Sequence, residues 1–310
     1  METNIPILNN FLYYMLSVKN CSINTVKNYS QTLQIFFDFI IEYLDWSIKP
    51  KDLTVFLLGN IEESTIIEYL IYLNHYRNNS SNTRKKALSA VRSFYKWLFL
   101  KYPYTLKGKI NPTMDLPVIN NVRRLPKYIK LEDAMKLQHI FNSTNSRFYI
   151  RNNAIITLFL NAGLRASELI NINISDIDFS NKQVRIIGKG NKERIVILNN
   201  KCMTSITKYL KTRNDTEKPL FITANNKRFT LMGIEEVCQK AYKLAGLNNC
   251  KYSAHILRHT SATYLYKSSQ DILVVKEFLG HSSIEATEIY THVMSKALKD
   301  AVNKNPLNNI

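Results

Sequence analysis

The sequence has few of the residues that build thiol, metal or membrane chemistry. Only four of its 310 residues are cysteines, and none forms a C-x-x-C pair, so neither a zinc knuckle nor a redox motif is indicated. The most apolar stretches, such as 35–41, are interrupted by charge and are far shorter than a membrane span. The first residues lack the basic start and apolar core of a signal peptide. We therefore expect a cytoplasmic chain with no metal site and no membrane partner.

Acidic residues are scarce relative to basic ones. The chain has 42 Lys and Arg against 24 Asp and Glu, a formal net charge of +18. Such an excess suits a polyanionic partner, with nucleic acid ahead of an anionic membrane surface. Asn, Ile and Lys are abundant throughout, which is typical of an AT-rich genome, so genome composition is an alternative source of part of this charge.

Glycine is nearly absent from residues 1–111, and no alternating strand pattern occurs there. Apolar residues instead recur at helical spacing, which predicts a compact all-helical N-terminal domain over 1–111. The predicted helices cover 4–20, 23–45, 63–78 and 81–102.

Two of these helices open in the same way, with hydroxyl residues followed by cations. One begins Ser22-Ile-Asn-Thr25 and the other Ser81-Asn-Thr83. A capped helix N-terminus with cations makes a good phosphate contact, although a capped helix with a solvated face explains the pattern equally well. The candidate DNA contacts are Thr25, Lys27, Thr83, Arg84, Lys85 and Lys86.

The helical periodicity fails over residues 112–126, where three prolines bracket Arg123 and Arg124. This pattern predicts an extended linker. A basic linker can pass beside a duplex and let two domains clamp it, so we add Arg123 and Arg124 to the candidate DNA contacts.

Residues 127–310 are predicted to form a second, mostly helical domain with one small antiparallel sheet. Strands at 183–187 and 194–198 flank Gly188-Lys-Gly-Asn and form a hairpin. Gly163 and Gly280 stand where helices end, and Ser282-Ser-Ile-Glu285 is a capping box that opens a helix towards Tyr290. The predicted helices cover 131–141, 148–161, 203–211, 230–245, 255–267 and 271–279. The fold class is thus mainly α.

Cations scattered over this second domain can hold a phosphodiester. Arginine neutralises phosphate oxygens best, because its planar fork is always charged, and Arg165 and Arg258 are the candidates. His255 lies three residues before Arg258 and shares its helix face. His281 directly follows Gly280, at a helix start. These groups can form a cage for the negative charge of a transition state.

A proton donor and a nucleophile complete the set. Lys189, at the tip of the predicted hairpin, can protonate the leaving oxygen, and dense positive charge favours the phenolate of Tyr290 as the attacking group. Each residue also has an ordinary explanation: Tyr290 is one of 18 tyrosines, His-x-x-Arg is commonly a solvated helix face, and a Gly-Lys-Gly tip is commonly only a turn. Together they predict phosphodiester cleavage that needs no metal, ATP or nucleotide cofactor.

The assembled residues resemble the tyrosine recombinase (phage integrase) family, most of all its Xer branch. The resemblance covers nearly the whole chain, because 22–37 and 83–98 are similar to the family's core-binding helices. The matching motifs are Gly163-Leu-Arg165-Ala-Ser-Glu-Leu, Gly188-Lys189-Gly-Asn-Lys-Glu-Arg, His255-Ile-Leu-Arg258-His-Thr and Leu279-Gly-His281 through Tyr290-Thr-His292. The resemblance implies catalytic roles for Arg165, Lys189, His255, Arg258, His281 and Tyr290, a supporting role for Glu168, and structural roles for His259 and His292.

The resemblance implies a site-specific DNA recombinase that acts through a 3′-phosphotyrosine, with Xer-like resolution of chromosome or plasmid dimers. The implied partner is double-stranded DNA, held by a homo-tetramer on two sites or by a hetero-tetramer with a paralogue. Three alternatives stay open: an integrase of a mobile element, a type IB topoisomerase-like relaxase, and a DNA-binding protein that has lost catalysis.

Overall fold

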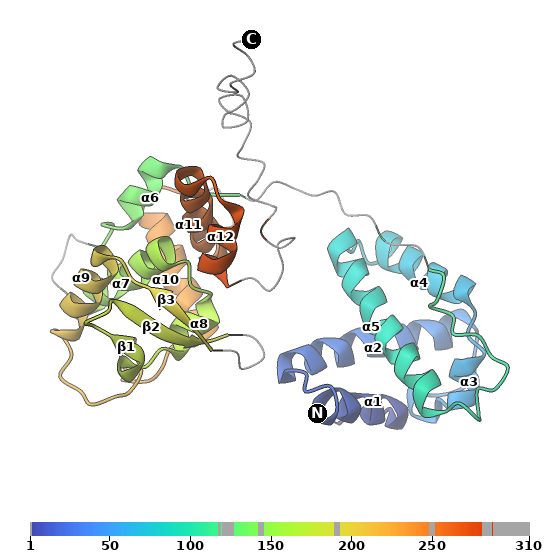
Figure 1. Ribbon diagram of the computed structural model, residues 1–310. Helices are drawn as coiled ribbons and strands as arrows, with labels where there is room; N and C mark the ends of the chain where they lie inside the picture. Colours follow the sequence, from blue (N-terminus) through green and yellow to red (C-terminus); the bar gives the residue numbers. More distant parts are fainter. Residues whose placement is uncertain are drawn as a thin grey trace, which may run out of the picture. The chain divides into compact units, whose positions relative to one another are not determined.

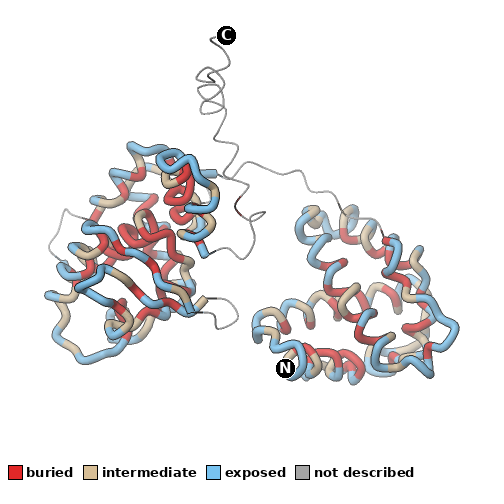
Figure 2. Tube along the Cα trace, viewed as in Figure 1, coloured by how far each residue is buried: buried red, intermediate tan, exposed pale blue. Residues whose placement is uncertain are grey.

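The chain divides into two compact units, Met1–Arg123 and Arg124–Ile310. The structure is a computed structural model that describes residues 2–116, 119, 127–141, 146–188, 193–247, 252–280 and 287 (Figure 1). Each unit has its own buried hydrophobic core, and in each the buried residues lie inside and the exposed residues outside (Figure 2). Because each unit buries its own core, each has the character of a separate domain.

The described part of the N-terminal unit is entirely helical. The four predicted helices are confirmed within a few residues, and a short helix and a 3₁₀ turn lie between the second and third. These two pieces are too short to show a helical period in the sequence. The elements are α1 (Pro6–Ser17), α2 (Ile23–Tyr43), the 3₁₀ turn Pro50–Asp52, α3 (Val55–Gly59), α4 (Glu63–His75) and α5 (Ser81–Lys101).

Aromatic rings from three helices meet in the core of this unit. The Phe94 ring of α5 meets Phe11 of α1 edge to face at 5.4 Å and Phe37 of α2 at 5.2 Å between ring centroids. All three side chains are fully buried. Edge-to-face pairs add to the free energy gained from area burial alone, so this cluster fixes α2 and α5 side by side.

Serine hydroxyl groups begin both helices that carry the predicted DNA contacts. The Ser22 Oγ accepts a hydrogen bond from the Thr25 backbone N–H at 3.2 Å, as the sequence predicts. At α5 the capping residue is Ser80, whose Oγ accepts from the Thr83 N–H at 3.3 Å, and Ser81 is the first helical residue. The prediction that Ser81 supplies the cap was wrong by one position, because two adjacent serines have the same capping chemistry.

The C-terminal unit is mostly helical around a small sheet, which confirms the predicted fold class. The strands form an antiparallel sheet in the order β1-β2-β3, and Ile186 of β2 lies opposite Arg194 of β3. The predicted hairpin is confirmed, and β1 is a third strand that the sequence pattern did not indicate. The elements are α6 (Leu131–Leu137), α7 (Arg147–Ala162), α8 (Ala166–Asn171), the 3₁₀ turn Ile174–Asp176, β1 (Ile177–Asp178), β2 (Gln183–Ile187), β3 (Glu193–Ile197), α9 (Asn200–Leu210), α10 (Leu231–Leu244), α11 (Ala254–Ser269) and α12 (Ile272–Leu279).

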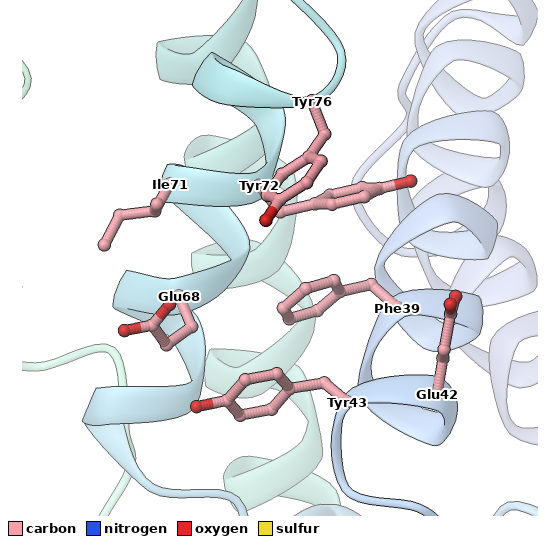
Figure 3. A pocket seen from close by; sticks show the side chains of 7 residues that line it. All are labelled: Phe39, Glu42, Tyr43, Glu68, Ile71, Tyr72 and Tyr76. Atoms are coloured by element: carbon pink, nitrogen blue, oxygen red, sulfur yellow. The ribbon is translucent and has the colours of Figure 1, made fainter.

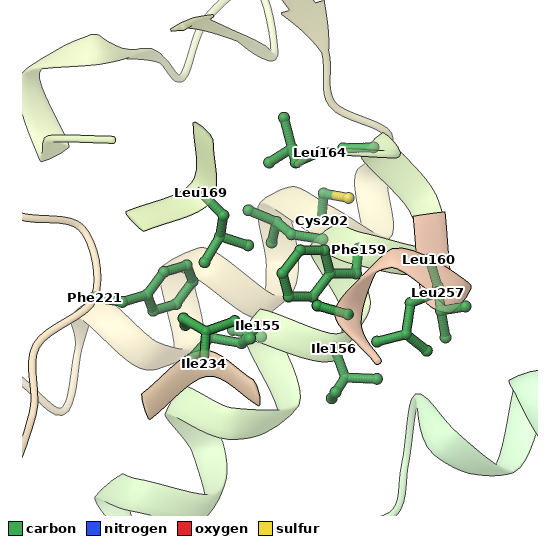
Figure 4. Packing of buried hydrophobic residues seen from close by; sticks show 14 of the residues in the cluster. Ile155, Ile156, Phe159, Leu160, Leu164, Leu169, Cys202, Phe221, Ile234 and Leu257 are labelled. Atoms are coloured by element: carbon green, nitrogen blue, oxygen red, sulfur yellow. The ribbon is translucent and has the colours of Figure 1, made fainter. Parts of the chain in front are cut away.

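Helix α7 is the centre of this second core. Its Ile155 and Phe159 side chains are fully buried and pack among residues of α9, α10 and α11, with Cys202 and Leu257 close by (Figure 4). Burial raises the pKa of the Cys202 thiol to about 12, so this cysteine behaves as a small apolar side chain. Because α7 contacts α11 directly, the C-terminal end of α7 has a fixed position relative to α11.

Two left-handed glycine turns lead into the region where the catalytic motifs lie. Gly163 ends α7 with φ +57°, and Gly280 ends α12 with φ +60°. A Cβ at Gly163 would also lie 2.9 Å from Cζ of Phe278. Both conformation and space therefore require glycine at Gly163, and this places Arg165 two residues beyond a tightly defined turn.

No helix in the described parts of the chain combines the length and the apolar character needed to cross a bilayer.

Replacing Ser80 by alanine should destabilise the N-terminal unit by about 1 kcal/mol, because an N-cap hydroxyl is lost. Ser81→Ala is the matched control and should cost much less. Both tryptophans, Trp46 and Trp97, lie in the N-terminal unit, so urea unfolding followed by tryptophan fluorescence reports this unit alone. Equal losses in the two variants would contradict the assignment of Ser80 as the cap.

Candidate active site

Arg165 is held in place by its own helix. It caps α8, where its backbone N–H donates to Oε2 of Glu168 at 2.8 Å and its Nη1 donates to Oε1 at 2.6 Å. Both hydrogen bonds run from Arg165 to Glu168: the carboxylate satisfies the N-cap backbone N–H, as in one half of a capping box, and the guanidinium, which has no acceptor, acts only as a donor. The Arg165 side chain remains 35% exposed, so its charge is oriented by the protein and still faces solvent.

Glu168 is a buried carboxylate that three arginines share. Besides Arg165, it receives Nη2 of Arg194 at 3.1 Å, and Nη1 of Arg258 lies 3.6 Å from Oε2. Burial by itself would raise the pKa of Glu168, but the Arg165 N–H groups and the charges of Arg194 and Arg165 outweigh it and hold the pKa below its ordinary value. Glu168 is therefore ionised at neutral pH.

Arg258 joins the ends of two helices. From α11, its Nη1 donates to the Gly163 carbonyl at 2.6 Å and its Nη2 to the Leu279 carbonyl at 2.7 Å. Its side chain is only 2% exposed. Arg258 thus fixes the end of α7 to the end of α12 and brings its charge directly beside Glu168.

His255 lies one turn before Arg258 on α11 and, unlike Arg258, is exposed. Although part of its side chain reaches solvent, partial removal of the imidazole from water, followed by the charges of Arg258 and Arg165, lowers the pKa of His255. Its imidazole is therefore neutral near pH 7 and can donate or accept a proton. His259, for which a structural role is implied, contacts the His255 ring at 4.3 Å between centroids.

The structure brings three of the six predicted catalytic residues into one site. Arg165 and Arg258 share Glu168 beside the ends of α7 and α12. His255 stands one turn before Arg258 on α11, near enough for both arginine charges to act on its pKa. Lys189, His281 and Tyr290 lie outside the described residues, as do His292 and the 282–285 capping box. The described segments that precede them in the sequence end at Gly188, directly after β2, and at Gly280, directly after α12. In the described part of the chain, no cluster of His, Cys, Asp and Glu could hold a metal ion.

Arg194 is a residue of this site that sequence reasoning missed. It stands on β3 and bonds both Glu168 and the Phe278 carbonyl, the latter at 3.2 Å. In the sequence it is only the last residue of the Gly-Lys-Gly-Asn-Lys-Glu-Arg motif. The partners that make it part of the site are distant in the sequence and meet it only through the fold.

Several predicted DNA contacts share one hollow in the N-terminal unit. A hollow of about 440 Å³ between α2, α4 and α5 is lined by Thr25, Thr83 and Lys86. Lys27 and Lys85 lie exposed on the same helices, and Arg84 is half-buried. Arg123 and Arg124 lie outside the described residues. Sequence reasoning missed the further polar residues of this hollow, whose helical spacing was the available signal: Asn28, Gln31, Thr32 and Ser89.

A second hollow of the N-terminal unit is lined by aromatic rings and carboxylates. It lies between α2 and α4, and its rings come from Phe39, Tyr43, Tyr72 and Tyr76 (Figure 3). Two carboxylates, Glu42 and Glu68, also line it. Carboxylates repel phosphate, so the hollow beside α5 is the one whose chemistry suits a nucleic acid backbone.

Comparison with known proteins identifies the family. The model of the phage integrase family matches residues 127–296, and the N-terminal SAM-like domain of phage integrases matches 7–102. Tyrosine recombinase XerC of Caldanaerobacter subterraneus subsp. tengcongensis is 39% identical, over 97% of this chain and 87% of that protein. The chain belongs to the phage integrase family. It is a Xer-like tyrosine recombinase, an enzyme of site-specific recombination.

Further relatives carry both Xer names. Tyrosine recombinase XerD of Rickettsia bellii is 31% identical, over 98% of this chain and 99% of that protein. Among solved structures, XerH bound to a palindromic difH substrate has the same fold, with a TM-score of 0.73 and 21% identity over 98% of each chain. The similarity thus extends over both units of the recombinase.

Glu168→Gln should destabilise the C-terminal unit of the recombinase by about 3 kcal/mol, because three arginine charges lose their buried partner. The difference in stability between Glu168→Gln and the unaltered chain should become smaller in acid. The stabilisation by the carboxylate is complete above its unfolded pKa, near 4.5, and is lost as the pH falls through the lower folded value. Urea unfolding followed by circular dichroism at pH 7 and pH 3 measures both effects.

Glu193→Gln is the matched control. Glu193 lies next to Arg194 in the chain, but its carboxylate pairs, among the described residues, only with exposed Arg185 at 3.8 Å, and such a pair contributes little to stability. A Glu168→Gln variant as stable as Glu193→Gln at pH 7 would show that the shared carboxylate is not a structural requirement.

Proposed function

We propose that this recombinase cuts and rejoins double-stranded DNA through a 3′-phosphotyrosine on Tyr290, with a Xer-type role in resolving chromosome or plasmid dimers. One observation supports the proposal most directly: Arg165 and Arg258 converge on buried Glu168. Two guanidinium groups held by one carboxylate make a preorganised anion site. The chain continues from the end of α12, beside this site, into the motif of His281 and Tyr290.

The two arginines have different tasks in this proposal. Arg165, partly exposed, binds the non-bridging oxygens of the scissile phosphate with its planar fork. Arg258, buried behind it, contributes a fixed positive charge and holds the backbone around the site. Because both groups are already oriented by protein contacts, little reorganisation is needed when negative charge increases in the transition state.

The bond changes balance without a cofactor. The Tyr290 phenol releases its proton to solvent and attacks the phosphorus as the phenolate. The bond to the 5′-oxygen breaks, and Lys189 donates the proton that the leaving oxygen needs. His255 and His281 contribute hydrogen bonds to the phosphate. The phosphotyrosine conserves the energy of the broken bond, so the 5′-hydroxyl of a partner duplex can reverse the step and exchange strands.

The proposed partner is duplex DNA in the cytoplasm. The hollow between α2, α4 and α5, with Thr25, Thr83 and Lys86 on its wall, fits a phosphate backbone, as does the net charge of +18. The solved XerH recombinase of the same fold is bound to a difH substrate. By analogy we propose a tetramer on two sites, formed by this chain alone or with a paralogue, since the relatives include both XerC and XerD.

Tyr290→Phe should bind DNA normally but form no covalent adduct, because only the attacking oxygen is removed. The measurement is trapping of protein on a nicked suicide duplex, with DNA affinity determined in parallel. A covalent adduct in this variant would assign the attack to another residue. Binding without an adduct in the unaltered chain would instead favour a DNA-binding protein that has lost catalysis.

Strand exchange separates the remaining alternatives. A covalent adduct that transfers its strand to a second duplex supports a recombinase, whereas relaxation of supercoils without transfer supports the topoisomerase-like alternative. Transfer between two identical sites on one plasmid, with no preference for an element end, supports dimer resolution over element mobility.

Lys189→Ala should cleave slowly, and a duplex with sulfur in place of the leaving 5′-oxygen should restore its rate. A thiolate leaves without a proton, so a missing general acid no longer matters. Arg165→Ala provides the control: it should lose about 10²-fold or more in cleavage and should not be restored, because its charge acts on the phosphate itself. If sulfur fails to restore Lys189→Ala, the acid is a different group, with His255 the next candidate.

A further inference from the structure

Arg194 connects three parts of the site. It stands on β3, in the second strand of the hairpin. Its Nη2 donates to Glu168 of α8 at 3.1 Å, and its Nη1 donates to the Phe278 carbonyl at the end of α12 at 3.2 Å. One planar guanidinium thus links the hairpin, the carboxylate that holds Arg165, and the last turn before Gly280.

The packing at Gly280 shows how closely the guanidinium fits. A Cβ on Gly280 would lie 2.6 Å from Cζ of Arg194 and would overlap its Nη1. Arg194 therefore lies directly against the left-handed turn that ends α12, and the absent side chain of Gly280 gives it space. The Arg194 side chain is only 18% exposed, so these protein contacts, rather than solvent, define its position.

The contacts of Arg194 suit a supporting task rather than a phosphate contact. Both terminal nitrogens of its guanidinium are committed, one to Glu168 and one to a backbone carbonyl, and a buried carboxylate with good hydrogen bonds on both oxygens keeps one orientation. Arg194 occupies Oε2, the oxygen that also accepts the Arg165 backbone N–H. It thereby fixes the carboxylate whose other oxygen orients the Arg165 side chain.

We propose that Arg194 is a positioning residue of the recombination site: by bridging Glu168 and the Phe278 carbonyl, it sets Arg165 and the end of α12 in the geometry that cleavage needs. This inference rests on the proposed function, because it assumes that Arg165 binds the scissile phosphate. It assigns to Arg194 an effect on the cleavage step and none on DNA affinity.

The bridge requires the shape of arginine. A lysine ammonium carries the same charge, but its compact head group cannot bond two acceptors in the directions that the planar fork reaches. Arg194→Lys should therefore behave like Arg194→Met in the cleavage step, although it keeps the positive charge.

The test is single-turnover cleavage of a nicked suicide duplex at saturating DNA, with the dissociation constant measured separately. Arg194→Met and Arg194→Lys should each slow covalent capture by about 10- to 100-fold, the usual effect of a small displacement of a catalytic group. Their dissociation constants should stay within about threefold of the unaltered chain, since Arg194 acts through Glu168 and Phe278.

Arg185→Met is the matched control. Arg185 lies on β2 of the same hairpin and its side chain is 60% exposed, with ion pairs to Asp176 and Glu193. The substitution removes the same charge from the same sheet, so it should leave the cleavage rate unchanged. Circular dichroism of all variants verifies that the helical content is retained.

A double-mutant cycle with Glu168→Gln provides a second readout. If Arg194 acts through Glu168, the combined variant should lose much less than the product of the two single losses. Equal cleavage by Arg194→Met and Arg185→Met, normal cleavage by Arg194→Lys, or losses that multiply would each overturn the proposal. Loss of affinity with normal cleavage at saturation would also overturn it, and would identify Arg194 as a DNA contact.

Failure of the positioning role of Arg194 can be told apart from failure of the proposed function. If the unaltered chain forms no adduct, or Tyr290→Phe still does, the assignment of the nucleophile is wrong. If the unaltered chain forms the Tyr290 adduct and Arg194→Met forms it equally fast, only the positioning role is wrong.

Discussion

The arrangement of the C-terminal unit depends on one buried carboxylate. Glu168 brings together guanidinium groups from α8, β3 and α11, which would otherwise repel one another. Burying a charge is costly unless it is paired and hydrogen-bonded. Here the attraction between the carboxylate and the guanidinium groups offsets the cost of removing both from water. The same pairing that makes the arginines tolerable in the fold also gives them fixed orientations, so the stability of the fold and the anion binding proposed for this site have one physical origin.

Helix α2 carries uncharged polar side chains along one part of its length and a carboxylate with aromatic rings along another. One part of this helix contributes Thr25, Asn28 and Gln31 to the hollow beside α5, and its C-terminal part contributes Glu42 and aromatic rings to the hollow beside α4. A basic chain that keeps carboxylates in one hollow and amides and hydroxyls in another restricts where a phosphate backbone can lie. The helix therefore has two chemically different surfaces.

The extent of sequence-based prediction follows from how local each signal is. Long amphipathic helices, the hairpin and the glycine turns at Gly163 and Gly280 were predicted, because each is written within a few consecutive residues. Helices α3 and α8 and strand β1 were missed, because elements of two to six residues show no period. The convergence of Arg165, His255 and Arg258 followed from recognising motifs in order, since spacing alone says nothing about contacts between α8 and α11.

Arg194 shows where that reasoning ends: its partners, Glu168 and Phe278, lie 26 and 84 residues away in the sequence, and only tertiary packing brings them within hydrogen-bond distance.

The carbonyl groups that Arg258 binds give the site a defined electrostatic balance. Gly163 and Leu279 stand at the C-terminal ends of α7 and α12, where each helix macrodipole carries about half a negative charge. Three guanidinium charges, reduced by one carboxylate and by these two dipole ends, leave a cluster of about one positive charge. This charge is opposite in sign and equal in size to that of the one phosphodiester that the site is proposed to bind. In that proposal, the second negative charge, which develops only as the bond breaks, is met by cations from elsewhere in the chain.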